Sequence, residues 1–356
     1  MNLFTLNTNF AVHSIIDSYK SFIWTDRYDE CGDFELYLPM TSDIEEAIPI
    51  GYYLQNSDSN RTMIVEQHKI TTDPEDGDWL IVTGRSLESI LDRRVVWGQV
   101  SYTSSLLQSV IFDLLNDNII SPTDTDRQIT SFITESNSDT RLSEMILSAQ
   151  YAGDNLYDVI QALCAAFSVG FSVTLNSSNQ LVFKLYVGVD RTYDQSTNPY
   201  VIFSPEFDNL LNSEYFRSLQ TYKNTILVGG EGEGSAKVYA AVGSGDTGLD
   251  RRETYVDAHD ISSNTDSGTL TQEEYLNQLA QKGTEELENY PAITAFDGEM
   301  DATRLFVYGR DYFCGDIVQV EDAYGHTSTS RITEMIFSDD EEGYKVYPTF
   351  ESTTEE

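Results

Sequence analysis

One segment of the sequence gathers several residue types that could do chemistry. YFCGDIVQVEDAYGH, residues 312–326, contains a thiol, three carboxylates and an imidazole, at Cys314, Asp316, Glu321, Asp322 and His326. Paired carboxylates can act as general acid and base, and a set of thiol, imidazole and carboxylate groups can hold a metal ion. The segment therefore raises the hypotheses of a catalytic or metal site, against that of an ordinary hairpin.

The spacing of these carboxylates argues against a catalytic pair. In a strand, Asp316 and Asp322 share one face and Glu321 lies on the other. Six residues at about 3.3 Å each separate the two aspartates by roughly 20 Å, whereas glycosidase carboxylates lie about 5–9.5 Å apart. DAYGH has the composition of a turn, which places His326 at an exposed hairpin end. We interpret the segment as structural, although partners from elsewhere in the chain stay open.

Other motifs make no positive case for an enzyme. GGEGEG, residues 229–234, follows a predicted strand, but it lacks the GxGxxG spacing and a following helix, so it predicts a hairpin tip. Cys164 falls on the buried face of a predicted helix, where a core role is expected. The four histidines show no metal-binding spacing, and neither a GxSxG elbow nor a phosphate-binding loop is present. We expect no catalytic residues, no cofactor and no metal.

The charge balance limits the partners that this chain can have. Among 356 residues, 59 are acidic and 21 basic, which gives a net charge of −38. Such a surface repels nucleic-acid phosphates and anionic membranes. Two explanations stay open: the acidity serves solubility alone, or part of it forms a surface along which a polyanion slides without sticking.

Length and composition predict a folded protein of two or three domains. The three cysteines lie far apart and are expected as reduced thiols of a protein made in a cytosol. The first residues lack the pattern of a signal peptide, and no apolar run approaches the ~20 residues of a membrane helix. The sequence predicts a soluble protein that does not insert into membranes.

The elements that position these residues divide the chain into strand-rich and helical parts. Residues 1–100 alternate and turn often, which is typical of short strands in a barrel or sandwich. Among them, DPEDGD at residues 73–78 has the composition of a hairpin loop. Helical periodicity and a hairpin predict a mixed α/β lobe at 101–215. Strands return at 216–250 and 292–356, around a helical insertion at 251–291. The fold class is therefore mixed α+β and mainly β. The two β units are similar in size, which raises the hypothesis of an internal duplication.

Three helices have identifiable start signals. Thr103 or Ser104 is available to cap a helix that follows them, and Asp154 is expected to cap the next. Thr271 and Glu274 have the spacing of a capping box at the start of the helical insertion.

Several segments together resemble a family of tail hub proteins from long non-contractile-tailed phages and related prophages. In larger relatives the same unit forms the amino-terminal part of the tail-associated lysin. The resemblance is carried in order by IWTDRYDECGDFELYLP, GRSLESILDRRVVWGQV, RRETYVDAHDI, YFCGDIVQV and GYKVYPTFE. It implies a fold similar to the central baseplate hub of contractile-tailed phages. Each chain would contribute two β-barrel tube domains, 1–100 and 216–250 with 292–356, and three chains would form a ring with pseudo-six-fold symmetry.

The resemblance also implies a function and partners. A structural, homotrimeric hub would end the tail tube, adapt six-fold to three-fold symmetry and let DNA pass through an acidic channel during ejection. Its partners would be the distal tail protein, the terminus of the tape-measure protein, and receptor-binding or tail-tip proteins. It would be made in the host bacterial cytoplasm and reside at the tail tip of the virion. The chain ends at YPTFESTTEE without a lytic module, so cell-wall hydrolysis is not expected.

Basic side chains are few in this acidic chain, so each of them is surrounded by many possible carboxylate partners. We expect five arginines to bridge subunits or anchor carboxylates, because guanidinium pairs well with planar carboxylate: Arg85, Arg93, Arg94, Arg251 and Arg252. The alternative is ordinary surface ion pairs, each worth at most ~1 kcal/mol.

Two rival functions stay open at this point. One is a tail-associated cell-wall hydrolase whose acidic pair comes from distant segments. The other is a module that binds host polysaccharide or a receptor, to which the 22 tyrosines would contribute stacking surfaces.

Overall fold

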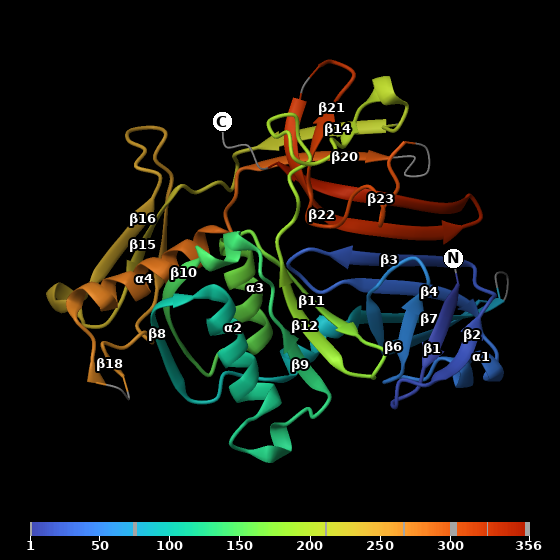
Figure 1. Ribbon diagram of the computed structural model, residues 1–356, viewed down its shortest axis with the longest axis horizontal. Coiled ribbons are helices and arrows are strands. Elements are labelled where there is room, and N and C mark those ends of the chain that lie inside the picture. The colour runs from blue at the N-terminus through green and yellow to red at the C-terminus, as the bar shows by residue number, and fades with distance from the viewer. Residues whose placement is uncertain are drawn as a thin grey trace.

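The computed structural model describes residues 2–73, 77–210, 212–265, 268–299, 305–325 and 327–352. Most of its strands belong to one sheet of 13 strands. In Figure 1 this sheet lies on the right, with a helical lobe in the centre and a smaller strand and helix group on the left. No described helix is long and apolar enough to span a bilayer.

The first β unit comes from the first 86 residues. Its strands alternate buried and exposed positions, so that Phe34, Leu36 and Leu38 point into the core. The long hairpin predicted around DPEDGD is confirmed by the pairing of Asp73 with Gly77, while residues 74–76 lie outside the described chain. The elements are β1 (Leu3–Leu6), β2 (Val12–Ile16), β3 (Ser21–Arg27), β4 (Asp33–Pro39), α1 (Ser42–Ala47), β5 (Tyr53–Asn56), β6 (Thr62–Asp73) and β7 (Gly77–Ser86).

The second β unit is built from segments late in the chain. Its strands are β13 (Ile202–Phe203), β14 (Asn212–Ser218), β20 (Ile293–Glu299), β21 (Ile317–Glu321), β22 (Thr327–Asp340) and β23 (Gly343–Ser352). The two units meet where β22 pairs antiparallel with β3, and Figure 1 shows β22 and β23 lying alongside β3. Trp24 and Phe34 of the first unit share one apolar core with Val318 and Phe337 of the second. One core therefore serves both units.

The two units repeat the same strand order along the sheet. The order β6-β7-β4-β3 is followed directly by β22-β23-β20-β14. In each unit a long strand pairs at its start with a short strand, β6 with β5 and β22 with β21. Each long strand also carries an irregularity, between Val65 and Gln67 in β6 and between Ile332 and Glu334 in β22. The internal duplication that the sequence raised is thus visible in the topology.

The sheet differs from two separate barrels. Among the described residues, the strand path runs from β14 to β2 without closing, and the two units share it through β3 and β22. The mainly β class is as predicted, but the pairing of the described residues forms no closed barrel. Alternation along a strand specifies its buried face and not its neighbour, so the sequence could not reveal that β3 pairs with a strand from the other end of the chain.

The lobe, which lies between the two β units in the sequence, has a core of its own. Its elements are β8 (Gln99–Leu106), α2 (Leu107–Leu115), β9 (Phe132–Glu135), β10 (Ile146–Ala152), α3 (Leu156–Ala166), β11 (Gly170–Leu175) and β12 (Leu181–Tyr186). Both predicted helices exist, but their starts differ from the expected ones. Thr103 and Ser104 belong to β8, and the side chain of Asn155, not Asp154, caps α3 by accepting from the backbone N–H of Tyr157 at 2.8 Å.

A third apolar cluster holds the outlying group on the left of Figure 1. Its elements are β15 (Thr225–Gly229), β16 (Tyr239–Gly243), β17 (Glu253–Asp257), β18 (Asn264–Thr265), β19 (Gly268–Thr269) and α4 (Gln272–Leu287). The capping box of Thr271 and Glu274 is confirmed at the start of α4. β15 pairs with β16 and β17, so strands expected at 216–250 share a sheet with the segment expected as an insertion.

Candidate assembly interface

The junction between the two β units is a ladder of six residue pairs. It runs from Arg27 opposite Glu334 to Phe22 opposite Asp339. At one end, the Arg27 guanidinium donates to Glu334 at 2.6 Å and to Asp33 at 3.0 Å. On the core side, Trp24 and Phe337 are opposite each other and almost fully buried. Backbone pairing and apolar packing therefore hold this junction, with one ion-pair cluster on its other face.

The pKa values of Asp29 and Tyr19, beside this junction, are shifted. Burial, assisted by the neighbouring Glu30, raises the pKa of Asp29 from 3.8 to about 6, against the opposing effect of Arg331. Burial and the hydrogen bond to Asp339 raise the pKa of the Tyr19 hydroxyl above its ordinary value. Both shifts follow from the loss of water at the seam between the units.

A buried ion pair joins the first β unit to the lobe. Glu88 lies in the short 3-10 helix η1 (Leu87–Arg93), and it pairs with Arg61, whose side chain is 8% exposed. Glu88 also accepts from the backbone N–H of Val173 in β11, at 2.8 Å. The Arg61 guanidinium reaches the hydroxyl of Tyr186 at the end of β12, at 3.1 Å. The pair thus ties the first β unit to two strands of the lobe.

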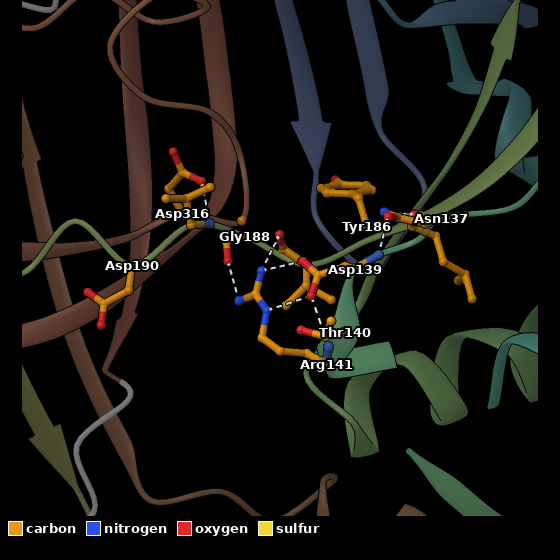
Figure 2. A network of polar contacts seen from close by, with 12 residues as sticks. Asn137, Asp139, Thr140, Arg141, Tyr186, Gly188, Asp190 and Asp316 are labelled. Atoms are coloured by element: carbon orange, nitrogen blue, oxygen red, sulfur yellow. Dashed lines mark hydrogen bonds and ion pairs between the residues drawn. The ribbon is translucent and has the colours of Figure 1, made fainter. Parts of the chain in front are cut away.

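A second polar network ties the lobe to the second β unit (Figure 2). Arg141 is held by Asp139 at 2.7 Å and donates to the carbonyls of Val187 and Gly188, where the chain leaves the lobe. A few residues later, Asp316 accepts from the backbone N–H of Val189 at 2.8 Å and pairs with Arg191 at 2.7 Å. The connection out of the lobe is therefore fixed on both sides by charged side chains.

Two glycines let the backbone segments cross at this connection. A Cβ atom added to Gly188 would lie 1.7 Å from the carbonyl oxygen of Gly315, and one added to Gly315 would lie 2.3 Å from the ring of Tyr28. Gly315 also has a φ of +96°, which disfavours other residues. Tyr28 donates from its hydroxyl to the carbonyl of Ser168 at 2.9 Å. The first unit, the lobe and the second unit all meet at this crossing.

Both aspartates of the segment that first suggested chemistry have structural partners. Asp316 is buried against Arg191, and Asp322 is buried beyond the end of β21, where it accepts from the backbone N–H of Tyr324 at 2.8 Å. Burial raises the pKa of Cys314 above that of an ordinary thiol, so the thiolate is disfavoured. His326 lies outside the described residues. Asp316 thus holds the lobe connection, and Asp322 holds the turn that follows β21.

The other motifs lie where the sequence placed them. β15 and β16 form the hairpin around GGEGEG. Cys164 is completely buried, and burial raises the pKa of its thiol well above the ordinary value. Within the described chain, no three His, Cys, Asp or Glu side chains gather in a way that could hold a metal ion.

The five singled-out arginines occupy two separate regions. Arg85 bridges Glu66 at 2.8 Å and Asp92 at 3.1 Å on the open face of the first unit. Arg93 is exposed at the end of η1, and Arg94 donates to the carbonyl of Arg127 at 2.9 Å. No described carboxylate pairs with Arg93 or Arg94.

The second pair lies at the end of the loop between β16 and β17. Arg251 pairs with Glu253 at 2.6 Å. Arg252 donates to the carbonyl of Leu219 and lies over the ring of Tyr222, 5.9 Å from its centroid. The structure therefore places both arginines on the outlying group, away from the β ladder.

The face of the sheet opposite the core is uncovered and polar. On the first unit, this face has a shallow depression of about 450 Å³, and the residues that line it include Ile23, Asp33, Glu35, Glu66 and Arg85. Arg27 and Arg85, the arginines nearest the depression, are each bonded to two carboxylates. Around the depression, both arginines are therefore paired with carboxylates, while Glu35 is exposed.

Sequence reasoning missed the residues that fix the three parts together, above all Arg61, Glu88, Arg141 and Arg191. One signal was available, since Glu88 stands in the otherwise apolar run SLESIL, where a carboxylate needs a partner. The others lie in ordinary polar surroundings. Their partners are far away in the chain, so spacing carries no information about them.

Comparison with known proteins identifies the wider group. The family model described as Siphovirus ReqiPepy6 Gp37-like protein matches residues 2–350. No curated protein matches the sequence.

Solved structures share the fold at low sequence identity. The 43 kDa tail protein of prophage MuSo2 from Shewanella oneidensis has a TM-score of 0.62 and 14% identity, with 98% of each chain covered. A tail protein from Neisseria meningitidis MC58 has a TM-score of 0.59 and 11% identity, covering 99% of this chain and 96% of that one. Prophage tail protein gp18 from Listeria monocytogenes EGD-e has a TM-score of 0.56 and 11% identity, covering 100% and 96%. The present chain is similar in fold to these proteins over nearly their whole length.

Proposed function

The chain belongs to the family of Siphovirus ReqiPepy6 Gp37-like proteins, and from this premise we propose that it is the structural hub of a phage tail tip. Three copies form a ring that ends the tail tube. The role is mechanical and not catalytic. Its fold is that of prophage tail proteins, which is the general class to which this function belongs.

The observation that carries the proposal is the repeated strand order of the two β units. A six-fold tube can dock on a three-fold ring when each subunit offers two equivalent units, because three copies then present six. The units follow one another along one sheet in the same direction, as successive members of a ring would. The tube domains of this proposal are the first β unit, within 1–100, and the second β unit, which combines β13 and β14 with the strands in 292–356. The strands β15 and β16, within 216–250, belong to the outlying group instead.

The uncovered face of the sheet is proposed to line the channel. DNA carries one charge per ~1.7 Å of duplex, so a wall that lets it pass must not offer free cations. Around the depression, Arg27 and Arg85 are already engaged by carboxylates, and Glu35 is exposed between them. Phosphates that approach this face would be repelled by acids and not retained by arginines.

The position in the particle and the partners follow from the hub role. We place the protein at the tail tip of the virion, after synthesis in the host cytoplasm. The distal tail protein and the terminus of the tape-measure protein would contact the ring from the tail side. Receptor-binding or tail-tip proteins would attach on the other side, and the exposed arginines of η1 and of the β16–β17 loop are available for such contacts or for contacts between copies.

A measurement of mass in solution tests the hub. Native mass spectrometry and sedimentation across a range of concentrations should give three copies, and negative-stain images should show a ring with a central opening. A single copy under all conditions, also after addition of the distal tail protein, contradicts the proposal. So does a clearing zone produced by the purified chain on zymograms of host cell walls.

A further inference from the structure

The internal repeat allows the contact between neighbouring copies to be derived residue by residue. We propose that the outer half of β6 in one copy pairs antiparallel with β14 of the next copy, in the register of the internal ladder between β22 and β3. This inference rests on the ring proposed above and adds the strands and the register that close it.

β6 and β22 are equivalent strands, but one of them lacks a neighbour. The start of β22 pairs with β21, and its end continues as the ladder to β3. The start of β6 pairs with β5 in the same way. Its end, residues 67–73, pairs with β7 on one side and with no other described strand. The position that β3 occupies beside β22 is therefore vacant beside β6.

The complementary edge lies at the far end of the sheet. β14 takes the place in the second unit that β3 takes in the first, and it pairs with β20 alone among the described strands. β3 uses its outer edge to bind β22. The equivalent edge of β14 is left for the β6 of another copy.

The two irregularities fix the register of β6. Beyond them, Gln67 stands opposite Thr83, just as Glu334 stands opposite Thr349. Gln67 is therefore equivalent to Glu334. Counting three residues further along both strands makes Ile70 equivalent to Phe337.

The pairing across the sheet fixes the register of β14. In the first unit, Trp24 is opposite Phe34, which is opposite Gly84. In the second unit, Tyr215 is opposite Phe296, which is opposite Phe350. Gly84 and Phe350 occupy equivalent positions. Gly84 faces Val65 and Phe350 faces Ile332, and these are the residues directly before the two irregularities. Tyr215 is therefore equivalent to Trp24.

Transfer of the internal ladder then gives the contact between copies. Phe337 faces Trp24 in the ladder, so Ile70 faces Tyr215 of the next copy. Ile336 faces Thr25, so Lys69 faces Phe216 of the next copy. The contact is antiparallel, as the internal ladder is.

Exposure supports this assignment. Phe337 is 1% exposed, whereas its equivalent Ile70 is 48% exposed on an open strand edge. Phe216 on the other edge is 49% exposed. Apolar side chains on an unpaired edge favour pairing with another chain. The two edges differ from each other, so the contact is heterologous and repeats around a ring.

Engineered disulfides test the register. The double variant Lys69→Cys with Phe216→Cys places thiols at positions that face each other across the contact, and mild oxidation should give covalent rings of three on a non-reducing gel. The control, Lys69→Cys with Leu219→Cys, shifts one thiol by three residues, or about 10 Å, and should give at most a tenth of that product. The native thiols, at Cys31, Cys164 and Cys314, are buried and should not contribute.

A charge on the edge provides a second test. Ile70→Asp should weaken association at least about fivefold, since the loss of one central interface residue costs about 1 kcal/mol or more. The control is Val12→Asp, at an aliphatic residue 67% exposed on β2, the other open strand of the first unit, and it should leave association unchanged. Circular dichroism checks that both variants are folded.

The outcomes separate this inference from the proposed function. If the wild type has three copies but the facing thiols do not crosslink better than the shifted ones, the contact is wrong and the hub survives. Crosslinks that extend beyond three copies, or an Ile70→Asp variant that associates normally, also overturn the contact. If the wild type remains a single copy even with the distal tail protein present, the proposed hub function is contradicted as well.

Discussion

The first β unit contacts the rest of the chain through two junctions of opposite chemistry. Toward the second unit, β3 and β22 share a backbone ladder and an apolar core in which Trp24 faces Phe337. Toward the lobe, the contact depends on the buried pair of Arg61 and Glu88. The ladder junction depends on apolar packing, so its stability should fall in proportion to the number of buried side-chain atoms that a substitution removes. The ion-pair junction should lose several kcal/mol when either partner is removed, because the remaining charge is then buried without compensation.

The largest effect is expected from Glu88→Gln. This change leaves the Arg61 guanidinium buried without its carboxylate and should lower the free energy of unfolding by about 3–5 kcal/mol. Urea denaturation followed by tryptophan fluorescence measures the loss.

A double variant sharpens the result. Arg61→Met combined with Glu88→Leu removes both charges, and it should recover most of the stability that Glu88→Gln loses. If the double variant is less stable than the single one, then the lobe junction depends on more than its charge balance, and the contrast between the two junctions is lost.

The ladder should respond to a change of volume. Phe337→Ala creates a cavity beside Trp24 and is expected to cost about 3 kcal/mol, near the low end for a buried phenylalanine. The same urea experiment applies, with Tyr239→Ala as an exposed aromatic control on β16. A loss below about 1 kcal/mol would show that the two units are not joined by their shared core.

The pH dependence of stability tests the shifted pKa of Asp29 beside the ladder. Asp29 has a pKa of 3.8 when unperturbed and about 6 in the folded protein, so the native state binds more protons between these values. Stability contributed by Asp29 is therefore highest below pH 4 and is lost as the pH rises to about 6.

Asp29→Asn removes this dependence. The variant should gain about 1–2 kcal/mol relative to the wild type on going from pH 4 to pH 7.5, which is a discounted fraction of the full linkage value. Thermal unfolding at the two pH values measures it, with Asp17→Asn as an exposed control. An equal effect of the variant at both pH values contradicts the shift.

The smallest effect is expected at the surface. Arg85 is 44% exposed, and although it bridges Glu66 and Asp92, Arg85→Ala should cost at most ~1 kcal/mol. Comparison with Glu88→Gln under the same conditions shows how much of the difference is due to burial. Similar losses for the two variants would remove that distinction.

Local signals predicted the elements of this fold well. The capping box of Thr271 and Glu274, the hairpin that ends in Asp73 and Gly77, and the buried face of α3 were readable because each depends on residues close together in the chain. The start of α3 was misplaced by one residue, since Asp154 and Asn155 are both good caps and the sequence does not rank them.

The contacts between parts of the chain were not readable. Arg27 and Glu334 are 307 positions apart, and the sequence around each residue does not indicate that the other is its partner. Asp316 looked like a catalytic candidate because its partner Arg191 lies 125 positions away. A polar residue is judged reactive or structural by what surrounds it, and in this molecule the surroundings come from distant segments.

The position of β22 beside β3 has a consequence for how the protein is made. β3 leaves the ribosome early, but the strand that completes its ladder is synthesised 307 residues later, roughly 15–60 s at about 5–20 residues per second. Throughout that interval the nascent chain has an unsatisfied strand edge beside Trp24, which is open to wrong partners. Folding of the sheet is therefore completed only after translation has nearly finished. Chains whose translation stops early keep this strand edge unpaired.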